Sequence, residues 1–244
     1  MTLRSFFKKW ISINSSRYHL EAFLIQAASS LPAGAWVLDA GAGDCRYANL
    51  FSHTNYLSVD FAQVNKAYGN LDIIADLSAV PLASEQFDAI ICTQVLEHLP
   101  RPWVTLSEFY RLLRPDGTLW LTAPFYYEEH EAPFDFYRYT QYGLTRLCAD
   151  AGFTIKSIEW LEGYWGTLSY QWRSAAYILP WTLPTSHYQT VSRLFSVPLL
   201  LTAKAVLAAM GLLAAYLDLW QRDRSRWHCK NYQLIAHKPP SVKT

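Results

Sequence analysis

The strongest constraint on the fold of this 244-residue chain is a regular alternation of short apolar runs with segments of helical periodicity. The first run, Trp36–Ala40, ends at the glycine turn Gly41-Ala42-Gly43, and similar runs follow at Tyr56–Asp60, Leu71–Asp76 and Phe87–Thr93. Strands that alternate with helices build a parallel, doubly wound sheet. The chain is therefore predicted to have an α/β fold.

The same rhythm continues to residue 160 and returns near the end of the chain. Helices are predicted at Tyr18–Ser29, at Pro102–Leu113 and from Thr140 to Ala151, and another can begin at Cys45–Phe51. The further strands are predicted at Thr118–Ala123, Phe153–Trp160 and Tyr232–His237. A turn with proline at its second position, Arg114–Gly117, is expected to separate the helix Pro102–Leu113 from the strand Thr118–Ala123.

Five parts follow from this pattern. We predict an N-terminal helical extension over 1–35, an α/β core over 36–160, a helical apolar insertion over 161–230, a last core strand over 231–238 and a tail over 239–244. Basic and aromatic side chains between Met1 and Trp10 fit either a surface anchor or a plain helical extension, and no cleaved signal peptide is expected.

Glycines and acids gather where the predicted strands end. In an open α/β sheet, ligands bind outside the carboxyl ends of the strands. Gly41 and Gly43 allow a tight turn close to a ligand, and Asp60, at the end of the next strand, suits a ribose diol. A dinucleotide fingerprint would need a small residue at position 46, where Arg46 stands, so a nicotinamide-dependent oxidoreductase is the weaker alternative.

Six short motifs extend this pattern along the first half of the chain. They are Val37-Leu38-Asp39-Ala40-Gly41-Ala42-Gly43-Asp44, Ser58-Val59-Asp60, Ala75-Asp76-Leu77 with Pro81-Leu82, Phe87-Asp88-Ala89-Ile90, Val95-Leu96-Glu97-His98-Leu99 and Leu112-Leu113-Arg114-Pro115-Asp116-Gly117-Thr118-Leu119. Together they resemble the class I S-adenosylmethionine-dependent methyltransferases of the type 11 small-molecule subgroup. The resemblance implies a Rossmann-like seven-stranded sheet whose antiparallel last strand lies beside the sixth.

The resemblance also implies a site for S-adenosylmethionine. The methionine part would contact Asp39, Gly41 and Gly43, the ribose would contact Asp60, the adenine would contact Asp76 and Leu77, and Gln94 with Glu97-His98 would lie under the sulfonium. Other readings stay open: the aspartates can be loop or helix-capping acids, and Glu97-His98 can simply begin a helix.

The four cysteines, Cys45, Cys92, Cys148 and Cys229, are far apart in the sequence and form no Cys-x-x-Cys pair. They are interpreted as reduced thiols of a cytoplasmic protein, and no metal site is predicted. Cys45 stands where many of the methyltransferases that this sequence resembles have a glycine. We expect the fold to tolerate a residue of this size.

A long aromatic and acidic segment, Phe125–Thr140, follows the fifth predicted strand, at the edge of the sheet where substrates are bound. Its run His-x-x-Pro-x-Asp-Phe-Tyr-Arg-Tyr-Thr resembles a signature of one methyltransferase subgroup, whose members often sit among genes for cell-surface glycan or lipid assembly. The catalytic candidates are His130, whose reference pKa is near neutral, and Asp135. Substrate binding is predicted for four residues: His98, Glu131, Tyr137 and Arg138. Alternatively, Asp135, Tyr137 and Arg138 lock the loop.

The apolar run Leu194–Leu217 is long enough to span a membrane, yet a single crossing would prevent the last strand from rejoining the sheet. Three interpretations remain: a helical cap over an apolar substrate pocket, a membrane-binding hairpin within 165–229, or a homodimer interface. A net charge of +1 argues against nucleic acid as a partner.

The sequence therefore predicts a methyltransferase acting on a small hydrophobic or lipid- or glycan-linked acceptor. We expect it to be cytoplasmic and peripheral at the inner face of a membrane. A non-catalytic scaffold with the same fold is a further alternative.

Overall fold

The computed structural model of the chain describes residues 13–181, 189–221 and 228–240. The segment Met1–Trp10 and residues 241–244 of the predicted tail lie outside the described residues. The chain forms two compact units, one made of His19–Leu161 with Asn231–Thr244, and the other of Met1–Tyr18 with Glu162–Lys230. Each unit is described separately below.

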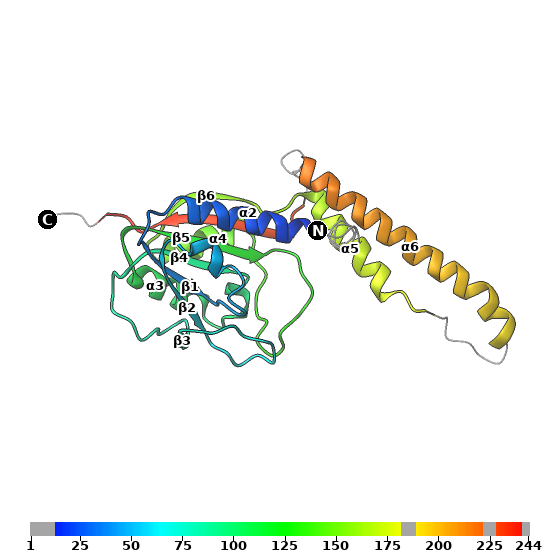
Figure 1. Cartoon of the computed structure of the whole chain (residues 1–244), viewed down its shortest axis with the longest axis horizontal. Coiled ribbons are helices and arrows are strands. Elements are labelled where there is room, and N and C mark those ends of the chain that lie inside the picture. Colours follow the sequence, from blue (N-terminus) through cyan, green and yellow to red (C-terminus); the bar gives the residue numbers. More distant parts are fainter. Residues whose placement is uncertain (1–12, 182–188, 222–227, 241–244) are drawn as a thin grey trace. The chain divides into compact units, whose positions relative to one another are not determined.

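A seven-stranded sheet with the order β3-β2-β1-β4-β5-β7-β6 forms the centre of the first unit (Figure 1). Strands β1 to β5 pair in parallel, whereas β7 pairs antiparallel with both β5 and β6. The α/β fold predicted from the sequence, with its antiparallel last strand beside the sixth, is confirmed. The strands are β1 Trp36–Ala40, β2 Asn55–Asp60, β3 Ile73–Ile74, β4 Phe87–Thr93, β5 Leu113–Pro124, β6 Thr154–Trp160 and β7 Asn231–His237.

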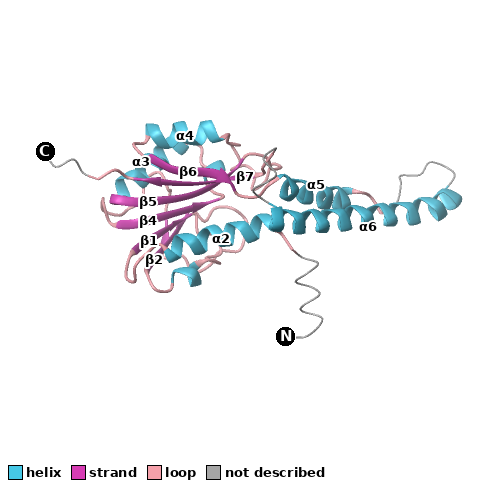
Figure 2. Ribbon diagram, turned by 90° about the horizontal axis from the view of Figure 1, so that it is seen from above, coloured by secondary structure: helices cyan, strands magenta, loops and turns pink. Residues whose placement is uncertain are grey.

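Helices cover both faces of this sheet. Figure 2 shows α2 on one face and α4 on the other. The sequence explains where α4 begins, because the Thr140 hydroxyl accepts a hydrogen bond from the Gly143 amide at 3.1 Å, as an N-cap should. The helical elements are α2 Ser15–Ser29, η1 Ala48–Phe51, η2 Leu96–His98, α3 Pro102–Leu112 and α4 Gln141–Asp150.

The core between α2 and the sheet consists of large apolar side chains. Phe23 is 3% exposed, and its ring meets that of Trp120 of β5 edge to face, with 5.2 Å between the ring centroids. Phe51 is fully buried and stacks on Tyr56 of β2. Burial of such rings is the main source of stability for a layered domain. It holds α2 against the sheet.

Three elements differ from the sequence-based expectation. The helix expected from Cys45 is only the short 3-10 helix Ala48–Phe51, because Cys45 itself has a left-handed backbone, with φ of +54°. The third strand is reduced to Ile73–Ile74 at the sheet edge.

The third difference is that β5 begins at Leu113, without the separate turn that was expected. The Asp116 amide donates to the Lys238 carbonyl at 3.0 Å, and the Lys238 amide donates to the Gly117 carbonyl at 2.9 Å. Lys238, which follows β7, therefore pairs with residues of the expected turn, and these residues form part of β5.

The second unit is built around two long helices, α5 Tyr164–Ile178 and α6 Gln189–Gln221, which run side by side (Figure 1). They approach closely at small residues: the Ser169 hydroxyl donates to the Gly211 carbonyl at 2.7 Å. A Cβ atom on Gly211 would lie 2.5 Å from the Arg173 side chain. The predicted helical apolar insertion before the last strand is confirmed.

Phe23→Ala should lower the free energy of unfolding by about 3–5 kcal/mol, because it leaves a cavity beneath Trp120. Urea unfolding followed by tryptophan fluorescence measures the loss. The control is Ile25→Ala on the same helix, where the side chain is 46% exposed, and its expected cost is below about 1 kcal/mol. Equal losses in the two variants would contradict the packing described for α2.

Candidate functional site

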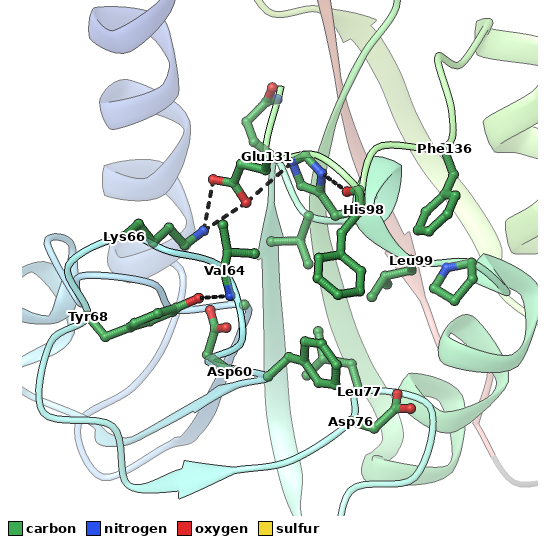
Figure 3. Close-up of a pocket in the computed structure, with 16 residues that line it drawn as sticks. Asp60, Val64, Lys66, Tyr68, Asp76, Leu77, His98, Leu99, Glu131 and Phe136 are labelled. Atoms are coloured by element: carbon green, nitrogen blue, oxygen red, sulfur yellow. Dashed lines mark hydrogen bonds and ion pairs between the residues drawn. The ribbon is translucent and has the colours of Figure 1, made fainter. Parts of the chain in front are cut away.

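A cleft of about 860 Å³, counting the space that opens to solvent, lies at the carboxyl ends of β1, β2 and β4. The strand order reverses between β1 and β4, the position at which α/β sheets bind ligands. Figure 3 shows side chains from both sheet and loops converging on this space. Seven of the residues predicted from the sequence line it: Gly41, Asp60, Asp76, Leu77, Gln94, His98 and Glu131.

The turn after β1 forms one wall of the cleft. Gly41 has φ of +85° and donates its amide to the Val59 carbonyl at 2.8 Å. A Cβ atom at Gly41 would lie 2.3 Å from a methyl group of Val95, so both conformation and space require glycine. The turn therefore packs closely against Val95, and Gly41 lines the cleft.

Asp60 ties the ends of two strands together. One of its carboxylate oxygens accepts from the Gly43 amide at 2.9 Å, and the other accepts from the Ala62 amide at 3.0 Å. The residue is only 8% exposed but lines the cleft, as Figure 3 shows. Gly43 itself is not among the lining residues; its amide holds the Asp60 carboxylate in place.

Asp39 lies behind the cleft wall and does not line the cleft. Its carboxylate is buried and accepts a very short hydrogen bond from the Tyr56 hydroxyl. Burial raises the pKa of Asp39 to about 6, against the lowering effect of the Tyr56 hydrogen bond. Asp39 therefore links β1 to Tyr56 of the neighbouring strand β2.

Asp76 and Leu77, expected beside the adenine, and Gln94, expected under the sulfonium, all line the cleft. The Asp76 carboxylate accepts from the Ser78 amide at 2.8 Å within a turn, and in the described chain no helix follows before β4 that Asp76 could cap. Leu77 is buried next to it. Gln94 has φ of +56°, and its side-chain amide donates to the Thr122 hydroxyl at 3.1 Å.

Charged groups from three segments meet at the mouth of the cleft. The Lys66 ammonium lies 2.9 Å from the Glu131 carboxylate, and a Glu131 oxygen lies 4.0 Å from Nε2 of His98 (Figure 3). The Nδ1 atom of His98 is 2.5 Å from the Phe134 carbonyl. Burial lowers the pKa of His98, so its ring is more readily neutral than a free histidine.

The remaining predicted residues, His130, Asp135, Tyr137 and Arg138, do not line the cleft. Arg138 makes a bidentate ion pair with Asp135, in which two guanidinium nitrogens lie 2.7 and 2.9 Å from the two carboxylate oxygens. Arg138 also donates to the carbonyls of Tyr127 and Glu128. This hydrogen bonding holds the pKa of Asp135 well below its usual range. The contacts match the loop-locking alternative for Asp135 and Arg138.

Tyr137 and His130 make further contacts from the same loop. The Tyr137 hydroxyl donates to the Pro100 carbonyl at 3.1 Å, and the His130 amide donates to the Asp135 carboxylate at 2.8 Å. The His130 ring meets the His98 ring edge to face, with 4.7 Å between the centroids. His130 therefore reaches the cleft through His98, and its role as a base stays a prediction.

Glu97 is the least satisfied acid of the site. Its side chain is fully buried, and neither carboxylate oxygen has a hydrogen-bond partner within the part of the chain that the structure describes. Burial raises the pKa of Glu97 to about 8.

Sequence reasoning missed several residues that line the cleft. Lys66 and Tyr68 come from the irregular segment between β2 and β3, where no periodicity or motif points to them. Phe134 and Phe136 lie in the aromatic segment that the sequence did indicate, although neither was chosen individually. The other missed residues are Phe61, Val64, Val95, Leu99 and Pro100.

Comparison with known proteins finds methyltransferases among the proteins similar to this chain. Residues 38–121 match the methyltransferase domain family of type 11. An uncharacterized methyltransferase of Mycobacterium bovis is 31% identical over 113 residues, covering 40% of this chain and 44% of that protein. A probable S-adenosylmethionine-dependent methyltransferase of Mycolicibacterium smegmatis is 32% identical over 100 residues, covering 38% and 39%. The chain thus aligns with less than half the length of these relatives.

Solved structures show the same fold. A methyltransferase from Archaeoglobus fulgidus, described as S-adenosylmethionine-dependent, superposes with a TM-score of 0.54 and 18% identity, covering 97% of this chain and all of that one. The [4+2]-cyclase SpnF has a TM-score of 0.55 and 18% identity, covering 92% and 82%. The match over residues 38–121 and the sheet topology thus show that this part of the chain is similar to S-adenosylmethionine-dependent methyltransferases.

Gly41→Ala should cost more stability than Gly34→Ala, although both glycines have a left-handed backbone. A Cβ atom at Gly34 (φ +79°) meets nothing within 4 Å, so that variant carries only the backbone penalty of about 1–2 kcal/mol. Gly41→Ala adds the collision with Val95, about 1–3 kcal/mol more. Adding Val95→Ala to the Gly41→Ala variant should recover part of this loss, because it removes the side chain with which the new methyl group collides. Urea unfolding measures all three variants, and equal costs at the two glycines would refute the close approach.

Proposed function

We propose that this chain transfers a methyl group from S-adenosylmethionine to a small acceptor bound beside it in the cleft. The observation that carries the proposal is the pairing of the glycine turn at Gly41 with the fixed carboxylate of Asp60, at the strand-order reversal of a methyltransferase-type sheet. The match to the methyltransferase domain family supports it.

The residues present fit this cofactor. The empty space above Gly41 would admit its amino acid part, and the Asp60 carboxylate, on the neighbouring strand, would receive the ribose hydroxyls (Figure 3). Asp76 and Leu77 lie together on the far side and would take the adenine. The group supplies a methyl carbon on a positively charged sulfur.

The chain's own residues would position the acceptor and exclude water. Methyl transfer from a sulfonium is an in-line displacement, so alignment and desolvation can supply much of its rate. Phe134 and Phe136 give one side of the cleft an apolar lining. The ion pair of Lys66 with Glu131, together with His98, offers the polar contacts that would orient an acceptor. His130 and Asp135 would hold the loop that carries these groups.

For the acceptor, we propose a hydrophobic or lipid- or glycan-linked molecule at the inner face of a membrane. Support comes from α6, of which Ser196–Gln221 is long and apolar enough to cross a membrane by length and composition, while only 11% of its most apolar window is buried. A helix with so much exposed apolar surface is typical of membrane or partner binding. A homodimer interface would use the same surface.

Asp60→Asn should weaken the binding of S-adenosylhomocysteine by about 1–3 kcal/mol, because a charge-assisted contact to the ribose is lost. This corresponds to roughly 5- to 150-fold in Kd by isothermal titration calorimetry. Asp88→Asn is the matched control, since Asp88 also accepts two hydrogen bonds, from Trp36 and Arg114, but at the other end of the strands. Unchanged affinity in Asp60→Asn would remove its role, and absence of binding to the native chain would contradict the proposed function.

Replacing Leu199, Val206 and Leu213 together by glutamate should abolish flotation with vesicles of phosphatidylcholine and phosphatidylglycerol. These α6 side chains are 69%, 50% and 61% exposed, and three buried charges would oppose insertion. The control places three glutamates at equally exposed apolar positions of the other unit, Ile74, Trp103 and Tyr142. If both variants float as the native chain does, the membrane proposal is wrong. Conversion of a dimer to a monomer without an effect on flotation would identify a dimer interface instead.

A further inference from the structure

Glu97, His98 and His130 form a cluster beside the cleft that methyl transfer does not explain. One potential ligand atom from each of the three side chains lies within 4.8 Å of the other two. His98 lines the cleft, and His130 contacts its ring from the loop after β5. Two histidines and one carboxylate are a donor set that transition metals favour.

Glu97 provides the second, independent observation. Its carboxyl group is fully buried, yet neither oxygen has a hydrogen-bond partner among the described residues, and the closest nitrogen of a basic side chain recorded is Nε2 of His98 at 3.9 Å. A buried polar group without a partner is costly, and native structures rarely contain one without a reason. A cation between Glu97 and the two histidines would supply the missing contact.

The two histidines are held in the orientation that metal binding requires. Nδ1 of His98 lies 2.5 Å from the Phe134 carbonyl, and Nδ1 of His130 lies 3.1 Å from the Glu128 carbonyl. A carbonyl oxygen can only accept, so in each neutral ring Nδ1 carries the proton and Nε2 keeps its lone pair. Histidine ligands almost always have such a partner on the nitrogen that does not bind the metal.

We propose that Glu97, His98 and His130 bind one divalent transition-metal ion of the zinc or manganese type. Zinc lies about 2.0–2.2 Å from nitrogen and oxygen ligands, so the three side chains would each shift by less than about 1 Å to reach it. Magnesium is disfavoured because it prefers an oxygen-only shell. Glu131, 4.0 Å from Nε2 of His98, lies at the entrance from the cleft (Figure 3).

The ion would face the space assigned to the acceptor, because His98 and Glu131 both line the cleft. An open metal position there would hold an oxygen of the acceptor, either a hydroxyl or a phosphate. This part of the inference rests on the proposed function, whereas metal binding itself does not.

The test uses the full-length protein after treatment with a chelator. Calorimetric titration with Zn²⁺ should show one site per chain, with weaker binding of Mn²⁺ and little of Mg²⁺. Co²⁺ should give visible absorption bands without the intense sulfur-to-metal band of a cysteine site. Glu97→Gln and His130→Gln should each weaken Zn²⁺ binding at least about tenfold. The control is His53→Gln, since the recorded hydrogen-bond partners of the His53 ring are the carbonyls of Ala28 and Leu31, and this variant should bind Zn²⁺ as the native chain does.

Each result decides the proposal. Absence of micromolar Zn²⁺ binding by the native chain, or equal affinity in Glu97→Gln, His130→Gln and the control, would overturn it. If Glu97→Gln fails to fold, His130→Gln carries the test, because the His130 side chain is 29% exposed. S-adenosylhomocysteine binding is measured on the same samples: its absence with Zn²⁺ bound would reject the proposed function alone, and its presence without Zn²⁺ binding would reject the metal site alone.

Discussion

The site depends on the contact between the backbone at Gly41 and the side chain of Val95. It brings the end of β1 against the start of the segment after β4, at the point where the strand order reverses. No side chain fits at Gly41 beside Val95, and both residues line the cleft. Asp60 then fixes the turn by accepting the Gly43 amide from the neighbouring strand. A binding surface results from three strand ends that no single segment could provide.

Sequence reasoning found the parts of this arrangement that follow from sheet geometry. Gly41, Asp60 and Gln94 all lie where strands end, so a parallel sheet has to bring them together. Lys66 could not be found in this way, because it comes from an irregular segment whose path depends on tertiary contacts such as its pair with Glu131. The extension of β5 to Leu113 likewise depends on Lys238, which is distant in sequence.

The low fraction of charged residues in this chain is partly due to one helix, α6. Only 17% of the residues are charged, and the second unit contributes to this deficit through α6. Its close packing on α5 uses small residues such as Gly211 and Ser169, which leaves larger apolar side chains such as Leu199 and Leu213 exposed. A helix that needed only to pack on α5 would carry polar residues on its other face. The proposed contact with a membrane or a second copy of the chain rests on this exposed apolar face.

Two buried acids of the first unit show why the environment, and not burial alone, decides what a carboxyl group can do. Asp39 and Glu97 are both shielded from water, and burial raises the pKa of each. Asp39 has the Tyr56 hydroxyl as a hydrogen-bond donor, so its contacts are complete within the fold. Glu97 has no such donor in the described chain and instead faces two histidine rings. The sequence could not distinguish these acids, because His130 lies more than 30 residues after the adjacent pair Glu97-His98; only the fold brings its imidazole to the other two side chains.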